Sequence, residues 1–276
     1  MKQDFRVPET EINRRKIKIQ AELQSAEIDG LFIIQPVDLF YFSGATSNGC
    51  LYIPSEGDPL LFIRQRLSTS PNLSPLKNIV EIQSIEQIPG LISDACGGLP
   101  STLGFDWDVI PVNIFNFFCD IFSDQNCVDG SPYILKVRAI KSDWEVMQLE
   151  RTGGLFKKTF EYAKTVIRPG MTEMEFAGIL EAFAGNLSPG AFVKVRDIHT
   201  EGDPGHILSG KSGGMVGLLD SPASGEGTSA AFPCGAGSKH LAANEPIMID
   251  FAFELNGYHM DVTRMFSIGD MPDKAM

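Results

Sequence analysis

Residues 245–269 read EPIMIDFAFELNGYHMDVTRMFSIG, and this stretch decides the fold of the second half of the chain. An apolar run from Ile247 to Phe253 is interrupted by a single carboxylate, Asp250. Asn256-Gly257 follows, the strongest short-range signal for a two-residue hairpin turn. The residues after the turn are rich in strand formers and contain a second carboxylate, Asp261. The sequence therefore predicts a β-hairpin with one aspartate in each strand.

A turn at this point also sets the register of the two strands. Ala252 then faces Asp261, and Asp250 faces Thr263. The two aspartates become diagonal neighbours on one face, roughly 7–8 Å apart at the backbone. Without a cation, two ionised carboxylates side by side on a buried sheet would repel each other and lose hydration. The pattern therefore points to divalent metal binding by Asp250 and Asp261.

The segment resembles the pita-bread metallopeptidases, the family of prolidase, Xaa-Pro aminopeptidase, methionine aminopeptidase and creatinase. Their signature is an apolar strand ending in Asp, a Gly-Tyr turn, Asp-x-Thr-Arg and a later Gly. It reads here Ile249-Asp250, Gly257-Tyr258, Asp261-Val262-Thr263-Arg264 and Gly269, with the family's eleven-residue step between the aspartates. The resemblance implies that Asp250 binds one metal ion, that Asp261 bridges two, and that Thr263 orients a ligand.

The same resemblance implies the chemistry of the complete protein. Two divalent ions, manganese, cobalt or zinc, are expected as cofactors, and such ions lower the pKa of a bridging water and polarise the scissile carbonyl. We therefore expect a Xaa-Pro aminopeptidase or dipeptidase, a prolidase-like hydrolase of peptides with proline at the second position. Relatives are often dimers, so a homodimer is expected.

Composition excludes several other classes of protein. The net charge of -12 argues against a nucleic-acid partner, because phosphate binding needs a basic face. No apolar run approaches the roughly 18 residues of a membrane span, and the N-terminus lacks the apolar core of a signal peptide. The 5 cysteines form neither a zinc pattern nor an even disulfide set. We expect reduced thiols and a cytoplasmic location.

The first half of the chain predicts a helix and short buried strands. Gln35-Pro36 predicts a turn. The helix is expected over residues 9–27 and the strands over 31–34, 50–53 and 60–63. This order resembles the N-terminal domain of creatinase and prolidase.

Two helix starts follow in the middle of the chain. Ser142 with Glu145, and Thr172 with Glu175, each have the spacing of a capping box. The same stretch resembles the opening of the catalytic domain in prolidase-like enzymes. The predicted fold class is therefore α/β (α+β). A creatinase-like mixed-sheet domain is expected in residues 1–134, and the first half of a pita-bread domain in residues 135–276.

Two features depart from the family pattern. The family also holds its metals through a His and two Glu from the second half of the domain, and these have no counterpart before Met276. We therefore expect a fragment that lacks its C-terminal half, is inactive by itself and need not bind metal alone.

The second departure is Cys234, which stands where prolidase-like enzymes carry a His near the substrate. That His is thought to stabilise the tetrahedral intermediate, and a thiol is a weaker donor than imidazole. His199, His206 and His240 are candidate replacements close in sequence, and each is more simply explained as an ordinary loop residue. His206 is the one to test.

Two other functions stay open. A creatinase-like, metal-free enzyme would cleave a C–N bond in a small molecule, but such enzymes lose the metal ligands, whereas both aspartates are present here. A non-catalytic relative would bind peptides in the same cleft. Cys234 favours this second alternative, as does Ala252, which replaces the family's usual Gly after Asp250-Phe251.

Overall fold

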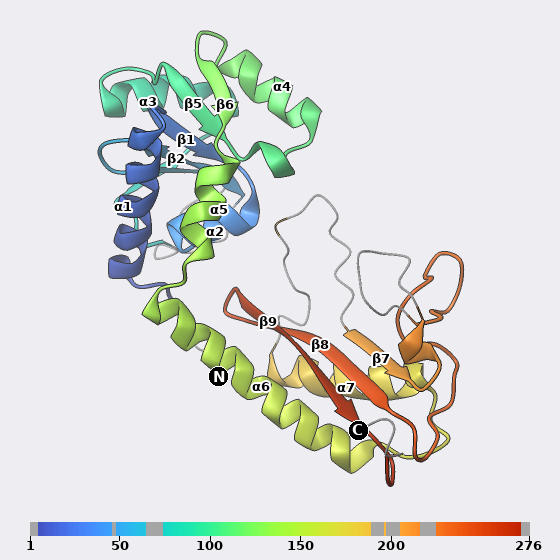
Figure 1. Ribbon diagram of the computed structural model, residues 1–276. Helices are drawn as coiled ribbons and strands as arrows, with labels where there is room; N and C mark the ends of the chain where they lie inside the picture. Colours follow the sequence, from blue (N-terminus) through green and yellow to red (C-terminus); the bar gives the residue numbers. More distant parts are fainter. Residues whose placement is uncertain are drawn as a thin grey trace. The chain divides into compact units, whose positions relative to one another are not determined.

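The computed structural model describes residues 5–45, 48–64, 74–188, 196, 205–215 and 225–271 (Figure 1). The described residues form two compact units. The first unit runs to Ser142 and includes Arg196, and the second begins at Asp143. The boundary predicted from the sequence, between residues 134 and 135, lies within helix α5 (Ser131–Ala139).

The first unit is a mixed sheet with helices on both faces. Its sheet has six strands in the order β4-β3-β2-β1-β5-β6. The pairs β1–β2 and β2–β3 are antiparallel, whereas β3–β4, β1–β5 and β5–β6 are parallel. Besides α5, its elements are α1 (Glu9–Ser25), β1 (Gly30–Ile33), α2 (Pro36–Ser43), β2 (Gly49–Pro54), β3 (Leu60–Ile63), β4 (Asn78–Glu81), η2 (Ile85–Gln87), α3 (Ile88–Cys96), β5 (Thr102–Phe105), η3 (Trp107–Val109), α4 (Val112–Ile121) and β6 (Asn126–Asp129).

The central strands of this sheet are buried on both faces, which explains their continuous apolar sequences. All four residues of β1 are buried. Leu31 and Ile33 belong to a core shared with α1, α2 and α5, and Phe32 belongs to a second core shared with α3 and α4. The strands predicted near residues 31–34, 50–53 and 60–63 are confirmed.

Helix α2 begins where the sequence predicted a turn. Pro36 occupies the start of the helix, and the Gln35 side chain accepts hydrogen bonds from the amides of Val37 (2.6 Å) and Asp38 (3.1 Å). Proline is favoured at this position because its missing N–H needs no partner there. The expectation of a turn at Gln35-Pro36 was therefore wrong, since the same residues begin a helix.

A buried ion cluster ties α2 to the rest of the first unit. The Asp38 carboxylate is fully buried. It accepts hydrogen bonds from Arg138 (2.5 Å) and Arg196 (2.5 Å), and Arg196 also reaches Asp108 (2.5 Å). A buried carboxylate needs such partners, because an isolated charge inside a protein is costly.

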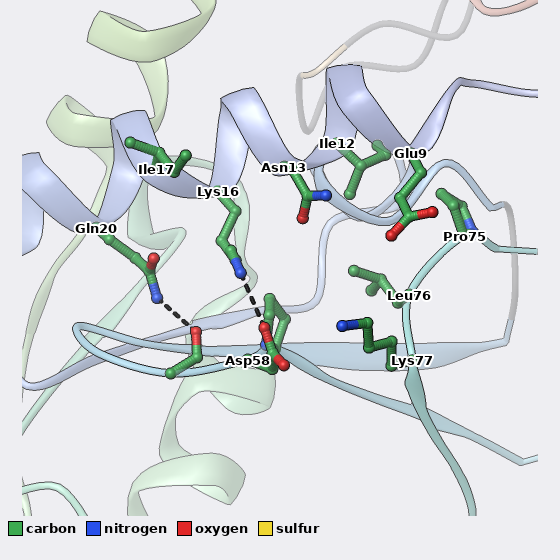
Figure 2. Close-up of a pocket in the computed structure, with 12 residues that line it drawn as sticks. Glu9, Ile12, Asn13, Lys16, Ile17, Gln20, Asp58, Pro75, Leu76 and Lys77 are labelled. Atoms are coloured by element: carbon green, nitrogen blue, oxygen red, sulfur yellow. Dashed lines mark hydrogen bonds and ion pairs between the residues drawn. The ribbon is translucent and has the colours of Figure 1, made fainter.

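Helix α1 is joined to the turn between β2 and β3, and a groove of about 640 Å³ lies between them (Figure 2). Lys16 forms an ion pair with Asp58 (2.8 Å). The Gln20 amide donates to the carbonyls of Pro54 (2.8 Å) and Gly57 (2.9 Å). Since these contacts cross the groove, we interpret it as part of the packing between α1 and the β2–β3 turn.

The second unit places two helices against one face of an antiparallel sheet. The strands lie in the order β7-β8-β9. Residues of α6, α7, β7 and β8 share the apolar clusters beneath the sheet, and α6 and α7 lie on the same side of it (Figure 1). The elements are α6 (Asp143–Val166), α7 (Glu173–Leu187), β7 (Gly205–Ser209), η4 (Ser212–Gly214), β8 (Ile247–Leu255) and β9 (Tyr258–Phe266).

The predicted start of α7 is confirmed. Thr172 is the N-cap, and its hydroxyl accepts a hydrogen bond from the Glu175 amide at 3.0 Å. Helix α6 begins at Asp143, directly after Ser142, as expected. Thr152 of α6 donates to the carbonyl of Tyr258 at 3.0 Å, which fastens the hairpin to this helix. Within the described ranges, no helix combines the length and apolar character that crossing a membrane requires.

Phe32 provides a test of the core that the sheet shares with α3 and α4. It is fully buried, and its ring centroid lies 5.7 Å from Phe105, 5.3 Å from Phe118 and 5.4 Å from Phe122. Phe32→Ala should lower the free energy of unfolding of this unit by about 3–5 kcal/mol through cavity formation. Urea denaturation measures the loss. Val112→Ala, at a 73% exposed position, is the control and should change stability by less than about 0.5 kcal/mol.

Asp106 should make the first unit less stable as the pH rises. Burial raises its pKa from 3.8 to about 6, although the amides of Gln35 and Ile34 donate to its carboxylate and oppose the shift. The folded state therefore holds the proton more tightly than the unfolded state. This stabilisation, about 3 kcal/mol, is present below the unfolded pKa and is lost as the pH passes the folded pKa. Asp106→Asn should remove this component of the pH dependence in denaturation measured from about pH 4 to about pH 7.5.

Candidate metal centre

The hairpin forms as the sequence predicted. Asn256 and Gly257 both have positive φ, 59° and 83°, as the tightest hairpin turns require. Ala252 pairs with Asp261, and Asp250 pairs with Thr263. The predicted register is confirmed over the whole length of β8 and β9.

Alternation along β8 separates an apolar face from a polar one. Ile249, Phe251 and Phe253 are buried against the helices, whereas Asp250 between them is only half-buried. Residues opposite each other in a ladder point to the same side, so Asp261 shares the face of Asp250. Asp261 is exposed in the described part of the chain.

The two carboxyl groups are near enough for the charge of one to affect the pKa of the other. Partial burial raises the pKa of Asp261, the Asp250 charge raises it further, and His206 opposes the shift. The Thr263 hydroxyl donates to Oδ1 of Asp250 at 2.5 Å and fixes that carboxylate on the sheet face. Like charges on neighbouring carboxyl groups favour protonation of one group or binding of a cation between them.

His206 joins this group from the neighbouring strand. In the β7–β8 ladder it lies directly opposite Asp250. Its effect on the pKa of Asp261 shows that it is also near the second aspartate. The structure therefore brings together Asp250, Asp261, Thr263 and His206, all named from the sequence.

The other histidine and cysteine candidates lie elsewhere. Cys234 is half-buried in the loop that precedes β8, where the Gly227 amide donates to the Gly235 carbonyl at 3.2 Å. His240 is exposed and forms an isolated bridge with Thr172. His199 lies outside the described residues.

A buried carboxylate that the sequence analysis did not single out holds β7 in place. Glu173 is fully buried at the start of α7. It accepts hydrogen bonds from the amide (2.7 Å) and hydroxyl (2.8 Å) of Ser209, from the Gly237 amide (3.2 Å) and from the Ser212 hydroxyl. Lys239 donates to the same Ser209 hydroxyl at 2.7 Å. Acidic residues are common in the first turn of a helix, because their negative charge interacts favourably with the helix dipole. The sequence alone therefore offered no reason to single out Glu173.

The donor set fits part of a divalent metal site. Asp250 and Asp261 supply hard oxygen donors on one face, and carboxylates suit manganese, cobalt and zinc. Among the residues whose positions are described, no group of three or more His, Cys, Asp or Glu side chains has metal-binding geometry. Two carboxylates are fewer donors than two ions require, so a complete centre needs further ligands.

Comparison with known proteins identifies both units. Residues 15–140 match the model of the Creatinase/Prolidase N-terminal domain, and residues 148–276 match that of Metallopeptidase family M24. The two parts of the chain therefore match, one after the other, a creatinase-type N-terminal domain and the M24 metallopeptidase family. The resemblance predicted from the sequence is confirmed, as is the α/β fold class.

Individual relatives agree with this assignment. The uncharacterized peptidase YqhT of Bacillus subtilis (strain 168) is 24% identical over 90% of this chain and 63% of its own length. The Xaa-Pro dipeptidase from Bacillus anthracis has the same fold, with a TM-score of 0.76, 19% identity and coverage of 96% of this chain and 67% of that one. The prolidase from Pyrococcus horikoshii OT3 also has this fold, with a TM-score of 0.72 and 19% sequence identity. The match covers 95% of this chain and 67% of the prolidase. This chain thus spans about two thirds of the length of these relatives.

Glu173→Gln tests the carboxylate that holds β7. The new amide group places hydrogen-bond donors opposite donors from Ser209 and Gly237, which should cost about 1–3 kcal/mol of stability in the second unit. Hydrogen exchange of β7 should accelerate accordingly. Glu175→Gln, on the exposed side of the same turn, is the matched control. Equal protection of β7 in the two variants would show that the Glu173 network does not support the strand.

Proposed function

We propose that the intact protein is a metal-dependent Xaa-Pro aminopeptidase or dipeptidase. The observation that carries the proposal is that Asp250 and Asp261 share one face of the β8–β9 ladder, where the charge of Asp250 raises the pKa of Asp261. The match of residues 148–276 to the M24 metallopeptidase family supports the hydrolase class. The proline specificity is inferred from the sequence resemblance and from relatives described as a prolidase and a Xaa-Pro dipeptidase.

Asp250 and Asp261 would hold two divalent ions, with manganese, cobalt and zinc as the candidates. When bound, such ions supply a water of lowered pKa and polarise a carbonyl group. Thr263 keeps the Asp250 carboxylate in one orientation through its hydrogen bond, and this preorganises the pair for binding. Two carboxylates do not complete such a centre, so further ligands would be needed, and we propose that this chain by itself is inactive.

His206 is the better candidate for the role that a histidine plays beside the substrate in this family. It lies opposite Asp250, whereas Cys234 lies on the loop before β8. An imidazole can donate a hydrogen bond to a developing oxyanion, and a thiol does so weakly. We therefore propose His206, rather than Cys234, as the donor.

The rest of the proposal concerns the substrate, the cellular location and the binding partners of the protein. The substrate would be a peptide with proline at its second position, and the intact protein would be a cytoplasmic homodimer without a nucleic-acid partner. The net charge of -12 supports the last point. Analytical ultracentrifugation of the intact protein tests the dimer directly.

A non-catalytic, peptide-binding protein is the alternative that a specific observation favours. Cys234 in place of the family's histidine suits a peptide-binding relative without catalysis. Metal analysis together with an activity assay separates this alternative from the peptidase. Absence of both bound metal and turnover in the intact protein would favour the binding protein. A creatinase-like, metal-free enzyme would turn over a small C–N substrate after chelation, and the paired aspartates argue against it.

Replacing either aspartate should abolish peptidase activity. Asp250→Asn and Asp261→Asn each remove a proposed metal ligand, so manganese-dependent release of the N-terminal residue from a Xaa-Pro dipeptide should fall by more than about 100-fold. Asp270→Asn, an exposed acid beyond β9, should keep normal turnover. Full activity in both site variants would contradict the proposal.

Thr263 gives a finer test. Thr263→Val removes the hydroxyl that donates to Asp250, so metal affinity of the intact protein, measured by calorimetry, should fall by about 10–100-fold. Thr263→Ser keeps the hydroxyl and should stay close to the unmodified protein. Equal affinities for the valine and serine variants would show that this hydrogen bond does not orient a metal ligand.

A further inference from the structure

A row of three apolar side chains crosses the sheet of the second unit beside the candidate site. Leu208 pairs with Met248 in the β7–β8 ladder, and Met248 pairs with Met265 in the β8–β9 ladder. Residues that face each other in a ladder point to the same side of the sheet. Leu208, Met248 and Met265 therefore form one continuous line of side chains, which we call the apolar row.

The apolar row lies on the face that carries the proposed metal ligands. Each of its members stands two residues along its strand from a residue of the candidate site, namely His206, Asp250 or Thr263. Residues two apart in a strand point to the same face and are separated by roughly 6.4–6.8 Å. The apolar row and the line of site residues are therefore immediate neighbours. An extended peptide spans about 3.3–3.6 Å per residue, so two or three residues are long enough to contact both.

The apolar row is covered at one end and open at the other. Leu208 is fully buried, although the apolar clusters described beneath the sheet include Ile207 and not Leu208. Its cover is the loop before β8, where Gly225 comes so close that a Cβ added there would overlap the Leu208 side chain. Met248 is half-buried and Met265 is 57% exposed. Within the described part of the chain, the two methionines are therefore accessible beside the candidate site.

These methionines are not needed to join the sheet to its helices. That packing uses the opposite face, where Ile249 and Phe251 belong to the cores shared with α6 and α7. The accessible methionines thus have apolar surface that contact with a ligand would remove from water. Their unbranched, polarizable side chains adapt to apolar groups of different shape. Apolar walls beside a few fixed polar groups are the usual composition of a small-molecule site.

We propose that the apolar row is the subsite for an apolar side chain on the first residue of the substrate. This inference rests on the proposed function, which assigns proline to the second position and leaves the first side chain to the surroundings of the metal centre. Leucine, methionine or phenylalanine would bury its side chain on Met248 and Met265. A glutamate side chain would be disfavoured, because thioethers cannot solvate its charge and the Asp250 carboxylate lies on the same face.

The first experiment compares the cleavage of two dipeptides by the intact protein. Met265→Ser removes the exposed end of the apolar row, and Met248→Ser removes its centre. In each variant, the ratio of kcat/KM for Leu-Pro to kcat/KM for Ala-Pro should fall by about 10-fold, as expected when apolar contacts in a pocket are lost. Circular dichroism verifies that the variants fold. Met174→Ser, at a 51% exposed position on α7, is the matched control and should keep the ratio. An unchanged ratio in both site variants would overturn the proposal.

The second experiment detects binding without turnover. The chain is isotopically labelled in its methionine methyl groups, and the NMR signals of Met248 and Met265 are assigned from the two serine variants. Millimolar Leu-Pro should shift both signals, and Glu-Pro should shift them much less. The Met174 signal should stay in place with either peptide. Equal responses to Leu-Pro and Glu-Pro, or no response to either, would also reject the subsite.

The two measurements separate this inference from the proposed function. Shifts of the methionine signals with Leu-Pro, in a protein whose intact form hydrolyses neither dipeptide, would reject the peptidase and keep the subsite as part of a peptide-binding surface. Hydrolysis of both dipeptides, with an unchanged ratio and no methionine response, would keep the peptidase and reject the subsite.

Discussion

The register of the β8–β9 ladder is the constraint on which the candidate site depends. Side chains alternate with a period of two along each strand, so a slip of one residue would move Asp250 and Asp261 to opposite faces. Asn256 and Gly257 prevent that slip, because their positive φ angles close a two-residue turn at one position only. The apolar half of the alternation packs against α6 and α7, which leaves the polar half available for ligands.

Asp38 in the first unit and Glu173 in the second are both fully buried carboxylates, and they are stabilised differently. Asp38 is neutralised by the guanidinium groups of Arg138 and Arg196. Glu173 is held by backbone amides and serine hydroxyls, which solvate the charge without cancelling it. The second arrangement matters for function, since it fixes one end of the strand that places His206 opposite Asp250.

Local signals in the sequence predicted the two aspartates and their hairpin, but they did not predict the buried hydrogen bonds that hold the neighbouring strand β7. The Asn256-Gly257 turn and the alternation of apolar residues are short-range features, so the hairpin register and the shared face could be derived directly. Gln35-Pro36 was misread because the same dipeptide suits a turn and a helix start, and only the amides of Val37 and Asp38 distinguish them. The Glu173 network could not be foreseen, because Ser209 lies 36 residues away and no local pattern encodes that contact.

The outer side of β9 has a consequence for work with this chain. In the part of the chain that the structure describes, β9 pairs with β8 alone, so its outer edge presents a row of backbone groups that no other strand pairs. Such a row is a template onto which another extended peptide can add. Purified preparations should therefore become turbid or self-associate as they are concentrated. Dilute handling, or a lysine introduced on that rim, would keep the chain dispersed.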